Sequence, residues 1–190
     1  MTASATREQI VRAADRLFYE RGFEHTSFAD IAGAVGLSRG NFYYHFKSKD
    51  AILDAVIAAR RDERRGWLAR WENEEPDPAA RILRFIEIVH VNRADIQAFG
   101  CPLGTMTTEL AKLEHTMLTQ AGDLLTLFRD WLTEQFRLLG YAERSGDLAM
   151  HVLTFSQGAA VLANLYRDES YIRREVDQMR AWLHALQPTT

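Results

Sequence analysis

The sequence predicts an all-α protein, and three observations carry this expectation. Apolar residues recur at helical spacing through most of the 190 residues. No stretch shows the apolar–polar alternation of a half-buried strand. The four prolines cluster at the loop 76–78, at Pro102 and at Pro188, so they bound helices and do not interrupt them. We expect about nine helices, arranged as a small N-terminal domain and a larger C-terminal one.

Local signals place the first three helices. Thr6 opens a capping-box pattern at the start of the first helix, and Gly22 is expected to end it. Two short helices should follow between residues 26 and 47, separated by a turn at Gly36. Glycine adopts positive φ there without steric cost. Ser38 is expected to cap the second of these helices with its side-chain oxygen.

The remaining residues predict a larger helical domain. Ser48 is the expected N-cap of a long helix over about 48–71, which links the two domains. Further breaks fall at the EEPDP loop, at Gly100 and at Gly140. The later helices are expected at about 79–95, from Pro102 onward, and at about 116–139, 142–166 and 170–186. We therefore predict two domains, 1–47 and 48–190.

The segment from Thr26 to Lys49 combines a glycine turn with a helix of two unlike faces. Phe42 and Phe46 lie four residues apart and are expected in the core. The other side of this helix carries Arg, Asn, Tyr, His and Lys donors, which suit phosphates and base edges. An apolar face behind a donor-rich face, following a glycine turn, is the helix-turn-helix arrangement.

This pattern resembles the N-terminal domain of TetR/AcrR-type transcriptional regulators. The resemblance runs from IVRAADRLFYERGFEHTSFADIA, which begins at Ile10, through GLSRGNFYYHFKSKDAILDAV, which ends at Val56. It implies that Arg39, Gly40, Asn41 and Tyr43 face the major groove and that Thr26, Ser38, Tyr44, His45 and Lys49 contact phosphates. The alternative is a solvated helix face with a structural tyrosine pair. The full set of residues expected to bind double-stranded DNA is Thr26, Ser27, Ser38, Arg39, Gly40, Asn41, Tyr43, Tyr44, His45 and Lys49.

Composition is that of a globular protein without a strong charge signal. The chain is 47% hydrophobic and 26% charged, with a formal net charge of −3. Residues 1–50 hold 7 Lys and Arg against 6 Asp and Glu, and the rest hold 16 against 20. A local basic face suffices for specific DNA binding, so the total does not exclude it. A single cysteine, and no signal-peptide or membrane-spanning pattern, predict a cytoplasmic protein.

A charge run follows within the long linking helix. Residues 60–65 read RRDERR, and we expect a solvated helix face with charge pairs three and four residues apart. The alternative is that this run extends the phosphate-binding surface.

The family resemblance implies that the second domain binds a small-molecule inducer that weakens DNA binding. Large apolar side chains there suit such a ligand, although each of them is also an ordinary core residue. Cys101 precedes Pro102 at a helix start, where the helix dipole favours a thiolate, so an electrophile is one candidate signal. The alternative for Cys101 is a small structural residue. The expected ligand-binding residues are Trp67, Phe85, Val89, His90, Cys101, Met106, Phe128, Trp131 and Phe155.

The last two helices offer an association surface. Small residues on helix 142–166 let another helix approach closely, and a bulky apolar stripe runs along helix 170–186. In the resembled family, two such helices pair with their copies across a two-fold axis. The expected homodimer interface comprises Ala159, Ala163, Met179, Trp182, Leu183 and Leu186. The alternative is that both stripes are buried only within the monomer.

Signals for catalysis or metal binding are weak. Phe155-Ser156-Gln157-Gly158 resembles an esterase elbow, but Thr154 stands where the elbow needs glycine, and helical sequence surrounds it. The histidines lack metal-ligand spacing, so we expect no metal, no cofactor and no enzyme. The sequence favours a ligand-responsive, homodimeric transcriptional repressor. The alternative is a helix-turn-helix regulator that acts through a protein partner without a ligand.

Overall fold

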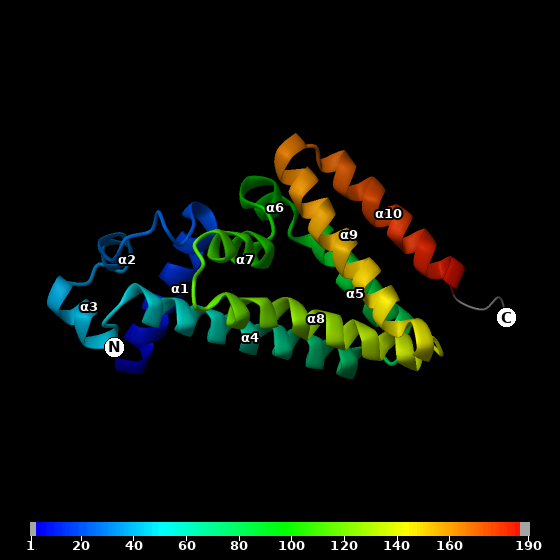
Figure 1. The fold of residues 1–190 in the computed structure, drawn as a ribbon, viewed down its shortest axis with the longest axis horizontal. Coiled ribbons are helices and arrows are strands. Elements are labelled where there is room, and N and C mark those ends of the chain that lie inside the picture. Colours follow the sequence, from blue (N-terminus) through cyan, green and yellow to red (C-terminus); the bar gives the residue numbers. More distant parts are fainter. Residues whose placement is uncertain (1–2, 187–190) are drawn as a thin grey trace. The chain divides into compact units, whose positions relative to one another are not determined.

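The computed structural model describes residues 3–186. Within this range every regular element is a helix, which confirms the all-α prediction (Figure 1). Most predicted helices appear within three residues of their expected bounds. The elements are α1 (Ala3–Arg21), α2 (Phe28–Ala34), α3 (Arg39–His45), α4 (Lys49–Glu74), α5 (Pro78–Val91), α6 (Arg93–Phe99), α7 (Pro102–Lys112), α8 (Leu118–Leu138), a 3-10 turn (Ala142–Arg144), α9 (Ser145–Tyr166) and α10 (Glu169–Leu186).

The chain divides into two compact units. The N-terminal unit comprises Met1–Arg64 and Thr105–Leu124, and the C-terminal unit comprises Arg65–Gly104 and Leu125–Thr190. Helices α4, α7 and α8 therefore each contribute residues to both units. The unit that contains the helix-turn-helix segment is larger than residues 1–47, because it also includes the start of α4 and most of α7.

The N-terminal unit packs α1, α2, α3 and the start of α4 around one apolar core. Ile10 of α1, Ile31 of α2, Phe42 of α3 and Ile52 of α4 are all fully buried. Helix α1 begins at Ala3, ahead of the predicted start, and Thr6 is a buried residue within it. The capping box predicted at Thr6 is therefore wrong, because the helix already covers the residues before it.

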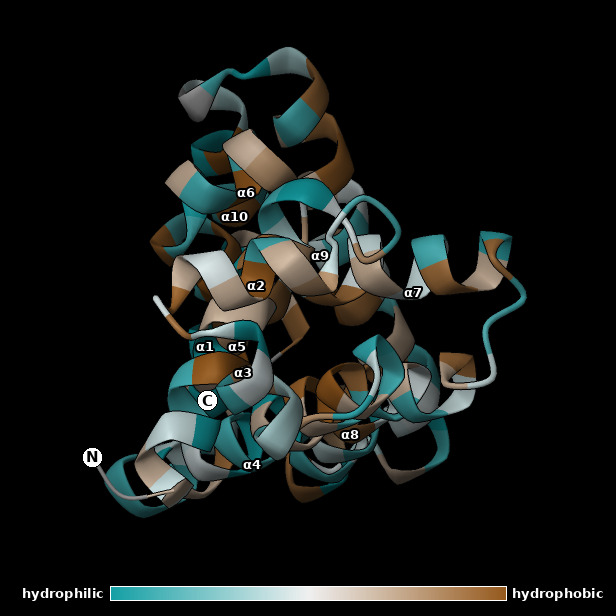
Figure 2. Ribbon diagram, turned by 90° about the vertical axis from the view of Figure 1, so that its left-hand side faces the viewer, coloured by the Kyte–Doolittle hydropathy of each residue, from teal (hydrophilic) through white to brown (hydrophobic). Residues whose placement is uncertain are grey.

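The C-terminal unit is built around α9. This helix packs against α5, α6 and α10, and α10 also packs against α5. Polar contacts join the same elements: Arg180 of α10 pairs with Glu87 of α5 at 2.8 Å, and Asn164 of α9 donates to the Gln97 carbonyl of α6 at 2.9 Å. Ribbons coloured by hydropathy change from brown to teal around individual helices, as expected for amphipathic packing (Figure 2).

One predicted helix is divided into two helices in the structure. The segment expected as a single helix over 79–95 breaks at Asn92, which separates α5 from α6. The Asn92 side chain donates to the Ile88 carbonyl oxygen at 2.8 Å, and its backbone leaves helical geometry at ψ 18°. Asparagine competes for helix carbonyls in this way, which explains the break.

Residues Ala142–Tyr166 are long and apolar enough to cross a membrane by length and composition alone. In this fold one side of this segment packs within the C-terminal unit, where Leu148, Val152, Ala159 and Ala163 are buried, while Val161 and Leu165 on the other side are exposed.

Candidate nucleic-acid interface

Helices α2 and α3 are joined by a tight turn with a defined cap at each side. Ser27 caps α2 and forms a capping box with Asp30, whose carboxylate accepts the Ser27 backbone N–H at 2.8 Å. Gly36 follows α2 with φ +66°, and Ser38 caps α3 by accepting the Asn41 backbone N–H at 3.4 Å. The structure confirms the predicted roles of Gly36 and Ser38.

One face of α3 is locked into the N-terminal unit. Phe42 is fully buried, and its ring meets Phe28 of α2 edge-to-face with centroids 4.7 Å apart. Phe46, just after α3, is also buried, and the Arg7 guanidinium of α1 lies 4.6 Å from its ring centroid. These contacts fix the rotation of α3 about its axis, so the side chains on the opposite face have defined directions.

The opposite face of α3 is exposed and rich in hydrogen-bonding groups. Tyr44 is 71% exposed, whereas Tyr43 is 39% exposed and packs against Phe28 at 4.9 Å. His45 is half-buried, and its ring meets the Tyr44 ring edge-to-face with centroids 5.2 Å apart. Such a face can contact phosphates and base edges without any rearrangement of the core. The predicted contact residues that are exposed in the structure are Ser27, Ser38, Arg39, Gly40, Asn41, Tyr43 and Tyr44.

Thr26 and Lys49 lie differently from the other predicted contacts. Thr26 is fully buried, and its hydroxyl donates to the Gly22 carbonyl oxygen at 2.7 Å. Its expected contact with a phosphate is corrected to a structural role, because carbonyls at the end of α1 need a donor. Lys49 is half-buried, and its ammonium donates to the Phe23 carbonyl oxygen at 2.9 Å. In this conformation it braces the α1–α2 turn.

The Asp30 carboxylate places a negative charge at the N-terminus of α2. Hydrogen bonds from the Ser27 hydroxyl and the Ser27 backbone N–H hold the pKa of Asp30 below its ordinary value of 3.8. Asp30 is therefore ionised at neutral pH, and it lies in the first turn of α2, where the helix dipole favours an anion.

Comparisons with known proteins agree with this geometry. Residues 10–56 match the bacterial regulatory proteins of the tetR family. Residues 78–178, more than half of the chain, match the C-terminal domain of LmrA/YxaF-like transcriptional regulators. The chain belongs to the TetR family. It is a DNA-binding transcriptional regulator, and its relatives and fold are not those of enzymes.

Several relatives resemble this TetR-family regulator over different lengths. The transcriptional repressor DhaR of Mycobacterium sp. (strain GP1) is 25% identical over 201 residues, covering 100% of this chain and 96% of DhaR. The regulator TtgR of Pseudomonas putida is 46% identical over 55 residues, 29% of this chain and 26% of TtgR. A TetR regulator structure from Legionella pneumophila is 28% identical with a TM-score of 0.81, covering 94% of this chain and 99% of that one.

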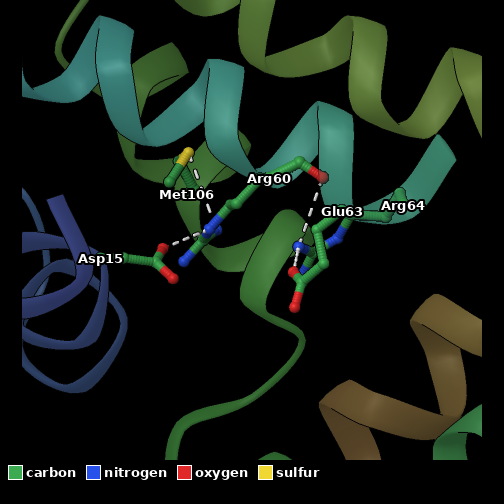
Figure 3. Close-up of polar contacts among 5 residues, drawn as sticks. All are labelled: Asp15, Arg60, Glu63, Arg64 and Met106. Atoms are coloured by element: carbon green, nitrogen blue, oxygen red, sulfur yellow. Dashed lines mark hydrogen bonds and ion pairs between the residues drawn. The ribbon is translucent and has the colours of Figure 1, made fainter. Parts of the chain in front are cut away.

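The charge run on α4 differs from its prediction. Arg60 and Arg64 are only 3% and 8% exposed, so they are not part of a solvated face. Figure 3 shows the Arg60 guanidinium between Asp15 of α1 and the Met106 sulfur of α7, and Arg64 beside Glu63. The guanidinium donates to the Asp15 carboxylate at 2.5 Å and lies 3.9 Å from the sulfur, while Arg64 pairs with Glu63. Arginine can continue a buried helix stripe because its aliphatic stem packs while the guanidinium reaches a partner.

Most of the side chains expected to bind a ligand lie in the C-terminal unit, but Met106 belongs to the N-terminal unit. Ring contacts bring Phe85 and Phe128 together at 5.1 Å. Trp131 instead packs on Trp71 and donates its indole N–H to Glu72 at 2.7 Å. The other expected residues are placed as follows: Val89 is buried, and Trp67, His90, Cys101 and Phe155 are half-buried.

Cys101 stands directly before α7, as predicted, and its thiol has a specific partner. The sulfur accepts the Gly104 backbone N–H at 3.4 Å, so it occupies the position of an N-cap acceptor. A Cβ at Gly104 would clash with the Gln157 side-chain oxygen of α9. The start of α7 is therefore fitted closely against α9.

Four of the six residues expected at the dimer interface are buried within a single chain, and the other two are half-buried. Ala159, Ala163, Met179 and Leu183 are buried within the C-terminal unit, so they pack the core of a single chain. Trp182 and Leu186 are half-buried, and Trp182 contacts the rings of Phe136 and His151 of its own chain. On α9 the predicted interface used the face with small residues. In the structure this face packs against α5, α6 and α10 of the same chain.

Sequence reasoning missed Glu109 of α7. Its carboxylate accepts the backbone N–H groups of Phe23 and Glu24, both at 2.9 Å, from residues 86 and 85 positions away. No local pattern could have indicated such a contact, because it depends on how α7 packs within the N-terminal unit.

Proposed function

We propose that the protein is a cytoplasmic, homodimeric repressor that places α3 of each protomer in a major groove of a palindromic operator. One observation carries this proposal: α3 has its apolar face locked by Phe42 and Phe46 and its donor-rich face free. Arg39 and Asn41 are proposed to contact base edges, and Ser27, Ser38, Tyr44 and His45 to contact phosphates. DhaR, a relative of similar length, is described as a repressor.

The proposed dimer surface is the exposed face of α9. Val161 and Leu165 are each 65% exposed and lie four residues apart, so they share one side of the helix. Neighbouring large apolar side chains that remain exposed, while most others are buried, are typical of an association surface. The large apolar side chains exposed on this helix are Met150, Val161, Leu162, Leu165 and Tyr166.

The proposed signal is a small molecule that binds the C-terminal unit and lowers operator affinity. Helix α7 supports this route, because it begins in the C-terminal unit and continues into the N-terminal unit. A second input is alkylation of Cys101, in which the sulfur bonds to carbon and gives up its proton. The bound substituent would disturb the cap that the sulfur forms with Gly104. The alternative is a regulator that responds to a protein partner.

The test of DNA recognition is selection from a random duplex library by the purified full-length protein. We expect an enriched pseudo-palindrome with half-sites about 34–36 Å, or a multiple of this, apart. Arg39→Ala should alter the recovered sequence. Lys47 is exposed just after α3, where its ammonium donates to the Tyr43 carbonyl oxygen, and is proposed to contact a phosphate, so Lys47→Ala should recover the wild-type sequence with weaker binding. Failure of the wild-type protein to enrich any palindrome would reject the proposal.

The two proposed signals, a non-covalent ligand and alkylation of Cys101, are distinguished by measuring binding to the selected duplex in the presence of N-ethylmaleimide. If Cys101 is the sensor, this alkene adds the sulfur and the thiol proton across its double bond, and the wild-type protein leaves the DNA. Cys101→Ser should bind DNA normally, since serine caps helices well, and should resist release. Equal release of both proteins would remove Cys101 as an input and leave the non-covalent ligand.

A further inference from the structure

The turn between α1 and α2 is a backbone anion site that the chain fills with its own carboxylate. Gly22 has φ +88°, and the N–H groups of the next two residues, Phe23 and Glu24, point to one spot. Consecutive backbone N–H groups arranged in this way form a concave site for an anion. Each oxygen of Glu109 accepts one of these N–H groups at 2.9 Å.

Gly22 and Glu109 fit each other closely. A Cβ built at Gly22 would lie 2.8 Å from one Glu109 carboxylate oxygen and 3.1 Å from the other. The carboxylate therefore occupies the space that a side chain at position 22 would take. Glycine is needed here both for its positive φ and for this approach.

The other side of the same turn is held by Lys49, the first residue of α4. Its ammonium donates to the carbonyl oxygens of Phe23, at 2.9 Å, and Glu24, at 3.4 Å. It also lies 4.2 Å from the centroid of the Phe23 ring, which His115 meets edge-to-face at 5.1 Å. The turn is thus fixed through its N–H groups by α7 and through its carbonyl groups by α4.

The position of this turn determines where α2 begins and how α2 meets α3. Thr26 hydrogen-bonds back to Gly22, and Ser27 then caps α2. The next residue, Phe28, packs against Phe42 and Tyr43 of α3 at 4.7 and 4.9 Å. A continuous series of contacts within the N-terminal unit therefore runs from Glu109 to the recognition helix.

Helix α7 is itself anchored where it presents Glu109. Met106 lies one turn before Glu109, and its sulfur is 3.9 Å from the Arg60 guanidinium, which also pairs with Asp15 of α1. Leu110 beside it is fully buried. The Glu109 carboxylate is therefore delivered from a rigid support.

We infer that Glu109 is a positioning residue for DNA recognition: by occupying the backbone anion site at Gly22–Glu24, it sets the placement of α3 without touching DNA. The inference rests on the proposed function of α3. It predicts that operator affinity depends on the Glu109 carboxylate, even though the side chain lies outside the helix-turn-helix segment.

The contact itself is tested without DNA, by amide hydrogen exchange in the full-length protein. Glu109→Ala should speed exchange at Phe23 and Glu24 selectively, and Glu109→Gln, which keeps one acceptor oxygen, should have a smaller effect. Glu114→Gln makes the same charge change at an exposed site after α7 and should leave both amides unchanged. Unaltered exchange at Phe23 and Glu24 in Glu109→Ala would overturn the anion-site assignment.

The positioning role is tested with the duplex that the wild-type protein selects, at a temperature where all variants are folded. Glu109→Ala should weaken binding about ten-fold, which corresponds to about 1.4 kcal/mol. Glu109→Gln should lie between Glu109→Ala and wild type, and Glu114→Gln should match wild type. A purely structural role would lower the melting temperature and leave the affinity of the folded protein intact, so that result would overturn the inference.

A double-mutant cycle of Gly22→Ala and Glu109→Ala measures whether the two residues affect DNA binding together or independently. In the wild-type background this change imposes positive-φ strain and also displaces the carboxylate, whereas in Glu109→Ala only the strain remains. We expect Gly22→Ala to weaken DNA binding several-fold less in the Glu109→Ala background. Independent, multiplicative losses would contradict the inference. A wild-type protein that selects no duplex would instead reject the proposed function, and the exchange experiment would still report on the contact.

Discussion

Helices α3 and α9 differ in how their two faces contrast. On α3, Phe42 is buried, and the surrounding exposed positions are polar or glycine. On the C-terminal half of α9 both faces are apolar, since Ala159 and Ala163 are buried while Val161 and Leu165 are exposed. When one face of a helix is polar and the other apolar, the sequence predicts which side meets solvent or DNA. For a helix that is apolar all round it does not, and only the packing of its neighbours decides which face remains available.

The first prediction compares the two faces of α3. Phe42→Ala should destabilise the protein by about 3–5 kcal/mol, because it removes a fully buried ring and leaves a cavity. Tyr44→Ala removes a ring that is 71% exposed and should change the free energy of unfolding by less than about 0.5 kcal/mol. Urea unfolding measures both values. A large loss for Tyr44→Ala would mean that α3 is rotated from the orientation described.

The second prediction compares the two faces of α9. Leu165→Asp places a charge on the exposed face, so the protein should stay folded but become monomeric and bind the selected duplex weakly. Ala163→Asp places the same charge in the core of the C-terminal unit and should prevent stable folding. Light scattering and circular dichroism distinguish the two outcomes. A Leu165→Asp protein that remains dimeric would locate the interface elsewhere.

The third prediction concerns the cap of α2 and has the smallest effect. The folded pKa of Asp30 lies below its unfolded value, so its contribution to stability is present above the unfolded pKa and is lost as pH falls through the folded pKa. Wild type should therefore exceed Asp30→Asn in melting temperature by a few degrees at neutral pH. The gap should close in acid, below about pH 3.8. A gap that persists at lower pH would assign the effect to something other than the carboxylate.

These regions also show what the sequence could predict. The turn at Gly36, the cap at Ser38 and the burial of Phe42 depend on neighbours within a few residues, and all three agree with the structure. The break at Asn92 was missed because asparagine interrupts helices only in some contexts.

Contacts between residues distant in the sequence could not be predicted from local sequence patterns. The buried Arg60 looked like one member of a solvated charge run, yet α1 and α7 bring Asp15 and Met106 to it. Thr26 was expected to contact a phosphate, yet it is buried and its hydroxyl donates to the carbonyl oxygens of Leu17 and Gly22. Glu109 contacts residues more than eighty positions away, so only the packed structure could reveal it.

Affinity measured base by base tests most directly whether the exposed face of α3 contacts base edges. Wild type and Arg39→Ala are compared on the selected duplex and on every single-base-pair variant of one half-site. We predict that wild type loses about 1–3 kcal/mol at one particular base pair and that Arg39→Ala loses this preference while keeping the others. An Arg39→Ala protein that retains the full pattern of base preferences would contradict base recognition by this face of α3.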